Sequence, residues 1–346
     1  MVSRVVLLCF SAVLLASCSD NTSVNPPLTP MAVRGLYIVN EGNFQRANAS
    51  LSFFVPDSGV MYNNVFQHAN GRSLGDVGHR IRMHNGLAYV VVNNSHRIEV
   101  VDPATHTVVK TIECLPGSSP RDIAFSASGL GYITNLYRNS VSVYHDESNS
   151  LIREIPVGPN PEGVATDGAR IFVANSGLGN GNTVSVITES VNEVWRTLTV
   201  GDYPTAVLNM PGGSIGILCS GAYNDFNDPN DDTPGSLIII DPMTLNKLDS
   251  IPLPGHPMHF ILDNKGNAWV IGDDVTRIHL ATRTSTPGVI PGFFYGGIFD
   301  PVHEKLYLAN ALDFVQQGML EVYDLEGNKV SSHTTGIIPG AMAFTQ

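Results

Sequence analysis

The sequence predicts an all-β fold, a seven-bladed β-propeller whose first blade is completed by the C-terminal strand. Three features predict it: a unit of about forty residues that recurs along the chain, four short β-rich runs within each unit, and an incomplete unit at each end. No unit has the 3.6-residue apolar period of a helix, which excludes a solenoid of helix pairs. The 33 glycines and 22 prolines are spread over the 346 residues, as many tight turns require.

A proline marks the start of the first, innermost strand in most units. A second apolar run follows a glycine turn, and the third run ends at a turn such as Asp102-Pro103. A fourth run, for example residues 108–112, leads to the next unit. Four strands separated by turn residues are typical of one propeller blade. The prolines follow one another at steps of 41, 43 and 53 residues: Pro120, Pro161, Pro204 and Pro257.

The two ends of the chain complete one another. Residues 35–40 resemble a second strand that lacks an inner strand before it, and residues 340–344 resemble an inner strand with no blade after it. Pairing them closes a ring of seven blades and removes open sheet edges, which would otherwise promote aggregation. The other inner strands are predicted to begin near Arg80, Arg121, Glu162, Thr205, Met258 and Tyr295.

The N-terminus predicts export and lipidation. A basic residue precedes an apolar run from Val5 to Leu15, which is too short to span a bilayer and suits the core of a signal peptide. Two small residues then precede Cys18, and this pattern resembles the bacterial lipobox, in which the cysteine is lipidated. We therefore expect a lipoprotein signal peptide over 1–17, lipidated Cys18 with a flexible tether over 18–34, and the propeller over 35–346. The alternative is an ordinary secretory signal with an incidental cysteine.

The charge balance limits the partners of this chain. Its net charge is −12 and it has no basic stripe, which excludes nucleic acid as a ligand. The same charge excludes docking on an anionic membrane surface, so we expect membrane contact only through the lipid anchor. A monomer is expected.

Two cysteines remain outside the N-terminal segment. Cys114 and Cys219 fall in different, non-adjacent predicted blades, so we expect buried free thiols rather than a disulfide. The chain has no CxxC and no Cys/His spacing typical of a metal site.

The N-terminal third contains several distinctive segments. They are Asn40-Glu41-Gly42-Asn43-Phe44 and residues 63–66, 69–72, 74–77 and 91–95. These segments resemble Bacteroidota surface lipoproteins of the DUF5074 type, and residues 35–346 as a whole resemble the YVTN/YncE-like and quinoprotein-dehydrogenase-like propellers. The DUF5074-like group includes proteins that capture cobalamin and pass it to a TonB-dependent transporter. The resemblance implies a lipid-anchored protein of the bacterial outer membrane, displayed on the cell surface, with a periplasm-facing position as the alternative.

The candidate binding site lies on the propeller face that carries the loops before each inner strand and between the second and third strands. Amides, aromatic rings and arginines in these loops suit a polar small molecule or glycan, because they offer hydrogen bonds, stacking and bidentate donors. A corrinoid or another substrate of a TonB-dependent transporter is one such candidate. The alternative for the asparagines, which end the second strand in five blades, is a structural role as turn caps. The alternative for Phe44 is that its ring packs back on its own loop. The predicted ligand-binding residues are Asn40, Glu41, Asn43, Phe44, Arg46, Asn93, Arg121, Tyr137, Arg138, Glu162, Asn175, Tyr223 and Asn310.

No catalytic residues and no cofactor are firmly predicted. Asp228, Asn230 and Asp232 place oxygen atoms at alternate positions and are weak Ca²⁺ candidates, but Thr233 replaces the expected glycine, so a solvated acidic loop is favoured. His256 and His259 are expected on opposite faces of a strand.

We therefore predict a non-catalytic surface binding protein that passes its ligand to a TonB-dependent transporter. The alternatives are a Ca²⁺-dependent lactonase-like propeller, for which Glu162 and Asn175 offer a thin resemblance, and a protein-interaction scaffold. A quinone-dependent dehydrogenase would need a Trp platform, whereas Trp195 and Trp269 are both predicted to lie in the core.

Overall fold

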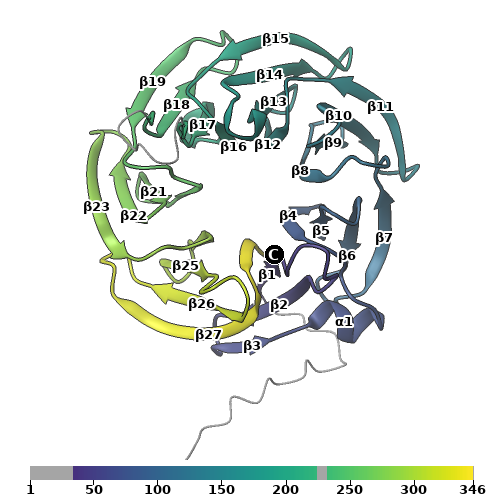
Figure 1. The fold of residues 1–346 in the computed structure, drawn as a ribbon, viewed down its shortest axis with the longest axis vertical. Helices are drawn as coiled ribbons and strands as arrows, with labels where there is room; N and C mark the ends of the chain where they lie inside the picture. Colours follow the sequence, from purple (N-terminus) through teal and green to yellow (C-terminus); the bar gives the residue numbers. More distant parts are fainter. Residues whose placement is uncertain (1–33, 224–231, 346) are drawn as a thin grey trace, which may run out of the picture.

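A computed structural model describes residues 34–223 and 232–345. The described chain forms seven four-stranded antiparallel sheets arranged as blades around a central axis (Figure 1). This confirms the predicted all-β, seven-bladed propeller. The predicted signal peptide, Cys18, most of the tether, Asp228 and Asn230 lie outside the described residues.

The blades are numbered here from the N-terminus, and each is given from its inner strand outward. Blade 1 consists of β28 (Pro339–Phe344), β1 (Leu36–Asn40), β2 (Ser50–Val55) and β3 (Val60–Tyr62). Blade 2 consists of β4 (Gly78–His84), β5 (Leu87–Val92), β6 (Arg97–Val101) and β7 (Val108–Glu113). Blade 3 consists of β8 (Pro120–Phe125), β9 (Leu130–Asn135), β10 (Ser140–His145) and β11 (Ser150–Pro156). Blade 4 consists of β12 (Pro161–Thr166), β13 (Arg170–Asn175), β14 (Thr183–Thr188) and β15 (Glu193–Thr199).

The remaining blades follow the same order. Blade 5 consists of β16 (Pro204–Asn209), β17 (Ile215–Cys219), β18 (Ser236–Ile240) and β19 (Lys247–Pro252). Blade 6 consists of β20 (His259–Leu262), β21 (Asn267–Ile271), β22 (Asp274–His279) and β23 (Thr284–Pro291). Blade 7 consists of β24 (Gly296–Asp300), β25 (Lys305–Asn310), β26 (Gln317–Tyr323) and β27 (Lys329–Ile337). The predicted inner strands thus begin within two residues of the observed ones.

Helical structure is confined to the connections. The α-helix α1 (Val65–Asn70) lies between blades 1 and 2, and short 3₁₀ turns are η1 (Gly177–Gly179) and η2 (Pro211–Gly213). In the described ranges, no helix has the length and apolar character needed to cross a membrane.

Blade 1 is closed by strands from the two ends of the described chain. Strand β28 pairs antiparallel with β1, with Tyr37 opposite Ala343 and Ile38 opposite Met342. Beyond the strand ends, the Gly35 amide donates to the Thr345 hydroxyl at 2.8 Å, and the Thr345 amide donates to the Gly35 carbonyl at 2.8 Å. The closure predicted from the two incomplete units is therefore confirmed.

The hydrophobic core lies between neighbouring blades. The second strands are buried on both faces, because each is covered by the blade on either side, and they carry large side chains such as Tyr89, Tyr132 and Phe172. Trp269 of β21 is fully buried, as predicted, and its indole N–H donates to Asp263 at 2.9 Å. The prediction for Trp195 was wrong: it lies on β15, an outermost strand with one face in solvent, and its side chain is 52% exposed.

The two cysteines confirm the prediction of free thiols. Cys219 is buried in blade 5 and Cys114 is half-buried in blade 2. Burial raises the pKa of each thiol to about 12, so both are protonated and poorly reactive at neutral pH.

The closing strand gives the first testable prediction. Ala343 is 8% exposed and packs in the core cluster that contains Tyr37 and Phe53. Ala343→Asp is expected to lower the free energy of unfolding by about 3–5 kcal/mol, because it buries an unpaired charge. Urea denaturation followed by circular dichroism measures it. Val330→Asp on exposed β27 is the control and should cost about 1 kcal/mol or less. Equal losses in both variants would contradict the role of the closure.

Candidate ligand-binding site

A cavity of about 350 Å³ lies on the propeller axis, at the face that carries the predicted binding loops. All seven blades line it, because each inner strand begins at the axis and directs its first side chains inward. One lining residue from each blade, in the order of blades 1 to 7, is Gly340, His79, Arg121, Glu162, Thr205, Met258 and Tyr295. Glu41, from the loop after β1, and Asp273, from the loop after β21, add a second and a third carboxylate.

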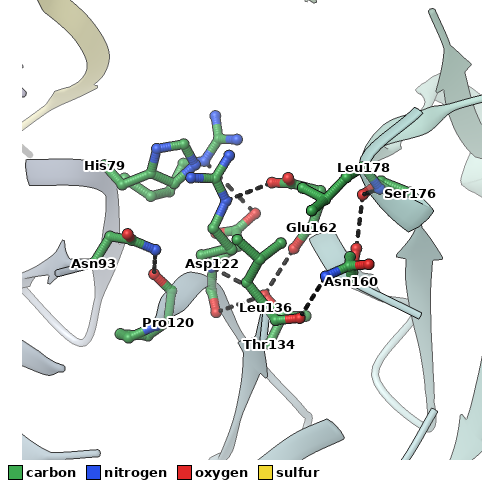
Figure 2. Close-up of polar contacts among 12 residues, drawn as sticks. His79, Asn93, Pro120, Asp122, Thr134, Leu136, Asn160, Glu162, Ser176 and Leu178 are labelled. Atoms are coloured by element: carbon green, nitrogen blue, oxygen red, sulfur yellow. Dashed lines mark hydrogen bonds and ion pairs between the residues drawn. The ribbon is translucent and has the colours of Figure 1, made fainter. Parts of the chain in front are cut away.

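Blades 1 to 4 form a charged wall of this cavity. The Arg121 Nε donates to Glu162 Oε2 at 2.6 Å. The Glu41 carboxylate lies 3.3 Å from His79 Nδ1, and its second oxygen accepts from the Tyr295 hydroxyl at 3.1 Å. Figure 2 shows His79 and Glu162 approaching this region from two sides. The wall therefore presents cations, carboxylates and an imidazole within one small volume.

Burial sets the protonation of this wall. It raises the pKa of Glu41 to about 7, because the charged form loses its hydration, and this outweighs the lowering by Arg121 and by the Tyr295 hydrogen bond. Burial, together with the nearby Arg121 and Arg80, lowers the pKa of His79 well below its ordinary value. At neutral pH His79 is therefore neutral, and Glu41 is close to half-protonated.

Blades 5 to 7 form an aromatic wall opposite. Tyr203, Tyr223, Phe293 and Tyr295 line the cavity there. The Tyr223 ring stacks on His256 with centroids 3.6 Å apart, and its 60% exposure leaves the other face open. A flat or apolar part of a ligand can pack on such rings while its polar groups meet the charged wall.

Arg80 and His259 form the floor of the cavity. Both also line a second cavity, of about 310 Å³, at the opposite end of the axis, so they lie between the two. Arg82 and Asp122 belong to the second cavity, where Arg82 donates two hydrogen bonds to Asp122 at 2.9 and 2.6 Å.

Four of the predicted ligand-binding residues meet in the axial cavity: Glu41, Arg121, Glu162 and Tyr223. Three of the predicted asparagines form hydrogen bonds within their own blades. Asn40 and Asn175 are fully buried and donate to serine or threonine hydroxyls within their own blades. Asn310 donates to Glu321, and the contacts of all three are those expected of the structural alternative.

Asn93 also has a structural role. It lies one residue after β5 rather than at the strand end, and its amide donates to the Pro120 carbonyl at 3.0 Å, as Figure 2 shows. The expectation that an asparagine ends the second strand in five blades therefore holds in four. None of these four side chains lines the axial cavity.

The predicted rim residues lie outside the cavity. Phe44 and Tyr137 are each 64% exposed, so Phe44 does not pack back on its loop. Arg138 donates to both oxygens of Glu154, at 2.6 and 2.8 Å. Asn43 donates to the Phe314 carbonyl, and Arg46 is exposed.

Most residues that line the cavity were not among the predicted ligand-binding residues. Arg80 was predicted only as the start of an inner strand, and His79 was not predicted, because no proline marks the start of β4. Tyr203 and Phe293 precede inner strands, and their proximity to the prolines was the available signal. Asp232, the described member of the predicted Ca²⁺ trio, lies 3.5 Å from His256 Nε2. Within residues 34–223 and 232–345, no three acidic, histidine or cysteine side chains cluster as metal ligands do.

The fold is a seven-bladed β-propeller with a cavity on its axis. Residues 34–333 match the family described as a domain of unknown function (DUF5074), and the chain belongs to that family. No curated protein matches the sequence.

Solved structures of several propellers resemble this chain. A quinoprotein alcohol dehydrogenase-like protein from Bacteroides thetaiotaomicron has a TM-score of 0.69 at 11% identity, over 90% of this chain and 78% of that one. Kuenenia stuttgartiensis hydrazine synthase has a TM-score of 0.64 at 18% identity, over 76% of this chain and 88% of that one. Apo AztD from Citrobacter koseri has a TM-score of 0.57 at 11% identity, over 90% of this chain and 98% of that one. At these identities the likeness shows the fold alone.

The raised pKa of Glu41 gives the second prediction. A carboxyl whose folded-state pKa is raised contributes stability below its unfolded value near 4.5, and that contribution is lost as the pH rises through about 7. Relative to Glu41→Gln, the wild type should therefore lose about 3 kcal/mol of unfolding free energy between pH 4.5 and 7.5. Urea denaturation of both proteins across this range measures the difference. Other titrations, including that of His79, largely cancel between them. If the unfolding free energies of the two proteins change in parallel with pH, the pKa of Glu41 is not raised and the prediction is wrong.

Proposed function

We propose that this protein is a non-catalytic binding protein that captures a polar small molecule in the axial cavity. The observation that carries the proposal is the division of that cavity into a charged wall and an aromatic wall. A volume of about 350 Å³ and a few convergent polar groups among apolar ones are typical of small-molecule sites.

The two walls suggest how a ligand is held. Arg121, His79 and the Tyr295 hydroxyl already have defined positions, so little ordering entropy is lost on binding. A corrinoid or another large substrate of a TonB-dependent transporter exceeds this volume. It would place one polar edge in the cavity and cover exposed rings at the mouth, such as Tyr223 and Phe293.

The carboxylates of the axis favour binding over metal-dependent catalysis. Glu162 is held by Arg121, Glu41 by Tyr295 and His79, and Asp122 by Arg82. Each of these three would have to leave a partner before it could coordinate Ca²⁺ as in a lactonase, and Asp273, the other carboxylate that lines the axial cavity, comes from blade 6.

Hydrolysis without a metal is the second candidate function. One observation favours it: a carboxyl with a pKa near 7 beside a neutral imidazole can act as a general base at physiological pH. Two solved propellers that resemble this chain are named as enzymes, hydrazine synthase and dihydro-heme d1 dehydrogenase NirN, and they share the fold alone. Turnover of lactones or esters that Glu41→Gln abolishes would establish this candidate over simple capture.

The cellular part of the proposal rests on the sequence. Lipidation of Cys18 would anchor the propeller to the outer membrane, and a tether to about residue 34 would let it tilt toward a TonB-dependent transporter that receives the ligand.

Ligand capture gives the third prediction. Thermal-shift screening of corrinoids, siderophores, haem and glycans should find one that raises the melting temperature, by the equivalent of about 2.7 kcal/mol at about 100 times its Kd. Thr205→Trp should abolish that shift, because the indole fills the cavity that Thr205 lines.

The matched control is Leu248→Trp on the outer strand β19, where the side chain is 56% exposed. It should keep the wild-type shift. A ligand that binds Thr205→Trp as tightly as the wild type would place the site elsewhere and contradict the proposal.

Lipidation gives the fourth prediction. Cells grown with an alkyne-tagged palmitate should label the wild-type protein, and Cys18→Ser should lose the label and move from the membrane to the soluble fraction. Cys114→Ser is the control and should keep both, because that thiol lies in blade 2. A label that persists in Cys18→Ser would exclude this cysteine as the anchor.

A further inference from the structure

Three arginines from blades 2 and 3 approach the axis, and two of them have a carboxylate partner. Arg82 donates two hydrogen bonds to Asp122, at 2.9 and 2.6 Å. Arg121 donates to Glu162 at 2.6 Å. These two arginines are neutralised in bidentate or short contacts of the kind that make strong ion pairs.

The third arginine, Arg80, has no such partner. Its nearest carboxylate oxygen is Asp122 Oδ2, 3.8 Å from Nε, which is beyond hydrogen-bonding distance. Its Nε is buried and has no hydrogen-bond partner within the described residues. Asp122 is already committed, since it also accepts from the Ile123 amide at 2.9 Å. Arg80 therefore brings a positive charge to the axis that one shared carboxylate does not compensate.

The other titratable groups around Arg80 do not supply the missing charge. His79 and His259 are neutral at physiological pH, because burial and the charge of Arg80 itself lower their pKa values. Glu41 is only partly ionised, and Glu162 is engaged by Arg121. A buried cation without a hydrogen-bonded counter-charge is costly. Such a group is expected where a ligand supplies the counter-charge.

The position of Arg80 makes its guanidinium accessible to a ligand. It lines the floor of the axial cavity, and its side chain remains 20% exposed. Small residues, among them Ala206, Gly340 and Ala341, surround the same level of the axis, so space is left beside the guanidinium. Its planar fork of N–H donors matches the two oxygens of a carboxylate or phosphate.

We propose that Arg80 binds an oxyanion, a carboxylate or phosphate group of the ligand, at the floor of the axial cavity. The proposal rests on the function proposed above and narrows the ligand to an anionic molecule. The charged group enters first and meets Arg80, and the rest of the ligand packs between Arg121 on one wall and the aromatic rings on the other.

The experiment compares the full-length wild type with Arg80→Met, which keeps the stem of the side chain and removes the charge. Thermal shifts are measured against inorganic phosphate and succinate at constant ionic strength. Since such anions also stabilise proteins by exclusion, the readout is the saturable part of the shift. The wild type should show it with at least one probe, and Arg80→Met should bind that probe at least tenfold more weakly. Arg153→Met, which removes an exposed arginine paired with Glu193, is the control and should behave as wild type.

A second measurement separates an anion site from a structural ion pair. In buffer without oxyanions, Arg80→Met should melt at the wild-type temperature or above it, because it removes an uncompensated charge. Arg82→Met should melt clearly lower, because it leaves Asp122 without its bidentate partner. If Arg80→Met melts as low as Arg82→Met, Arg80 is structural and the proposal fails.

The remaining outcomes distinguish this proposal from the function it rests on. If Arg80→Met keeps the saturable shift and Thr205→Trp loses it, the anion binds in the cavity without Arg80, and only this inference is overturned. If both variants keep the shift, the anion binds elsewhere on the protein. That overturns this inference, and the screen with Thr205→Trp then decides the proposed function by itself. If no probe gives a saturable shift, the anion site is excluded.

Discussion

The pairing of β28 with β1 is the interaction on which the rest of the structure depends. Without it, β1 lacks its inner neighbour, and both β4 and β24 lose the inner strand packed between them at the axis. The inner strands β24 of blade 7 and β28 of blade 1 lie very close together. A Cβ on Gly296 would collide with the backbone of Gly340, so only glycine allows this approach. Closure thus fixes the diameter of the ring, and the diameter fixes how far apart the axial side chains stand.

A fixed ring forces side chains of seven blades to share one small axial volume. Burial there would be unfavourable for isolated charges, so most of them are paired across blades: Arg82 of blade 2 with Asp122 of blade 3, and Arg121 of blade 3 with Glu162 of blade 4. These pairs link neighbouring blades at the axis, as the hydrophobic clusters link them further out. Arg80 differs from these paired arginines, because the nearby carboxylates of Asp122 and Glu162 are hydrogen-bonded to Arg82 and Arg121. Its unpaired charge therefore indicates a place where an anion can bind.

The sequence predicted the fold closely because its signals are local and repeated. Prolines before inner strands, Asp-Pro turns and the two incomplete ends each depend on a few adjacent residues, and all agree. Arg121, Glu162 and Tyr295 could be placed at the axis for the same reason, since they occupy a set position in the repeat.

The parts that could not be predicted depend on contacts between distant residues. Asn40 and Asn175 follow the loop pattern, but hydroxyls across the sheet withdraw them from the surface. Trp195 has an apolar ring on a strand whose outer face no blade covers. Whether an arginine is neutralised is likewise a matter of which carboxylate lies within 3 Å, and in a ring that is decided by the neighbouring blade rather than by the neighbouring residue.

The proton affinity of Glu41 also depends on residues of other blades. Arg80 and Arg121 both lower the pKa of Glu41, so an anion that screens Arg80 would raise that pKa further. Binding of an anion at the floor and uptake of a proton at the wall are then coupled, because the anion adds a negative charge near Glu41 and protonation of Glu41 removes one.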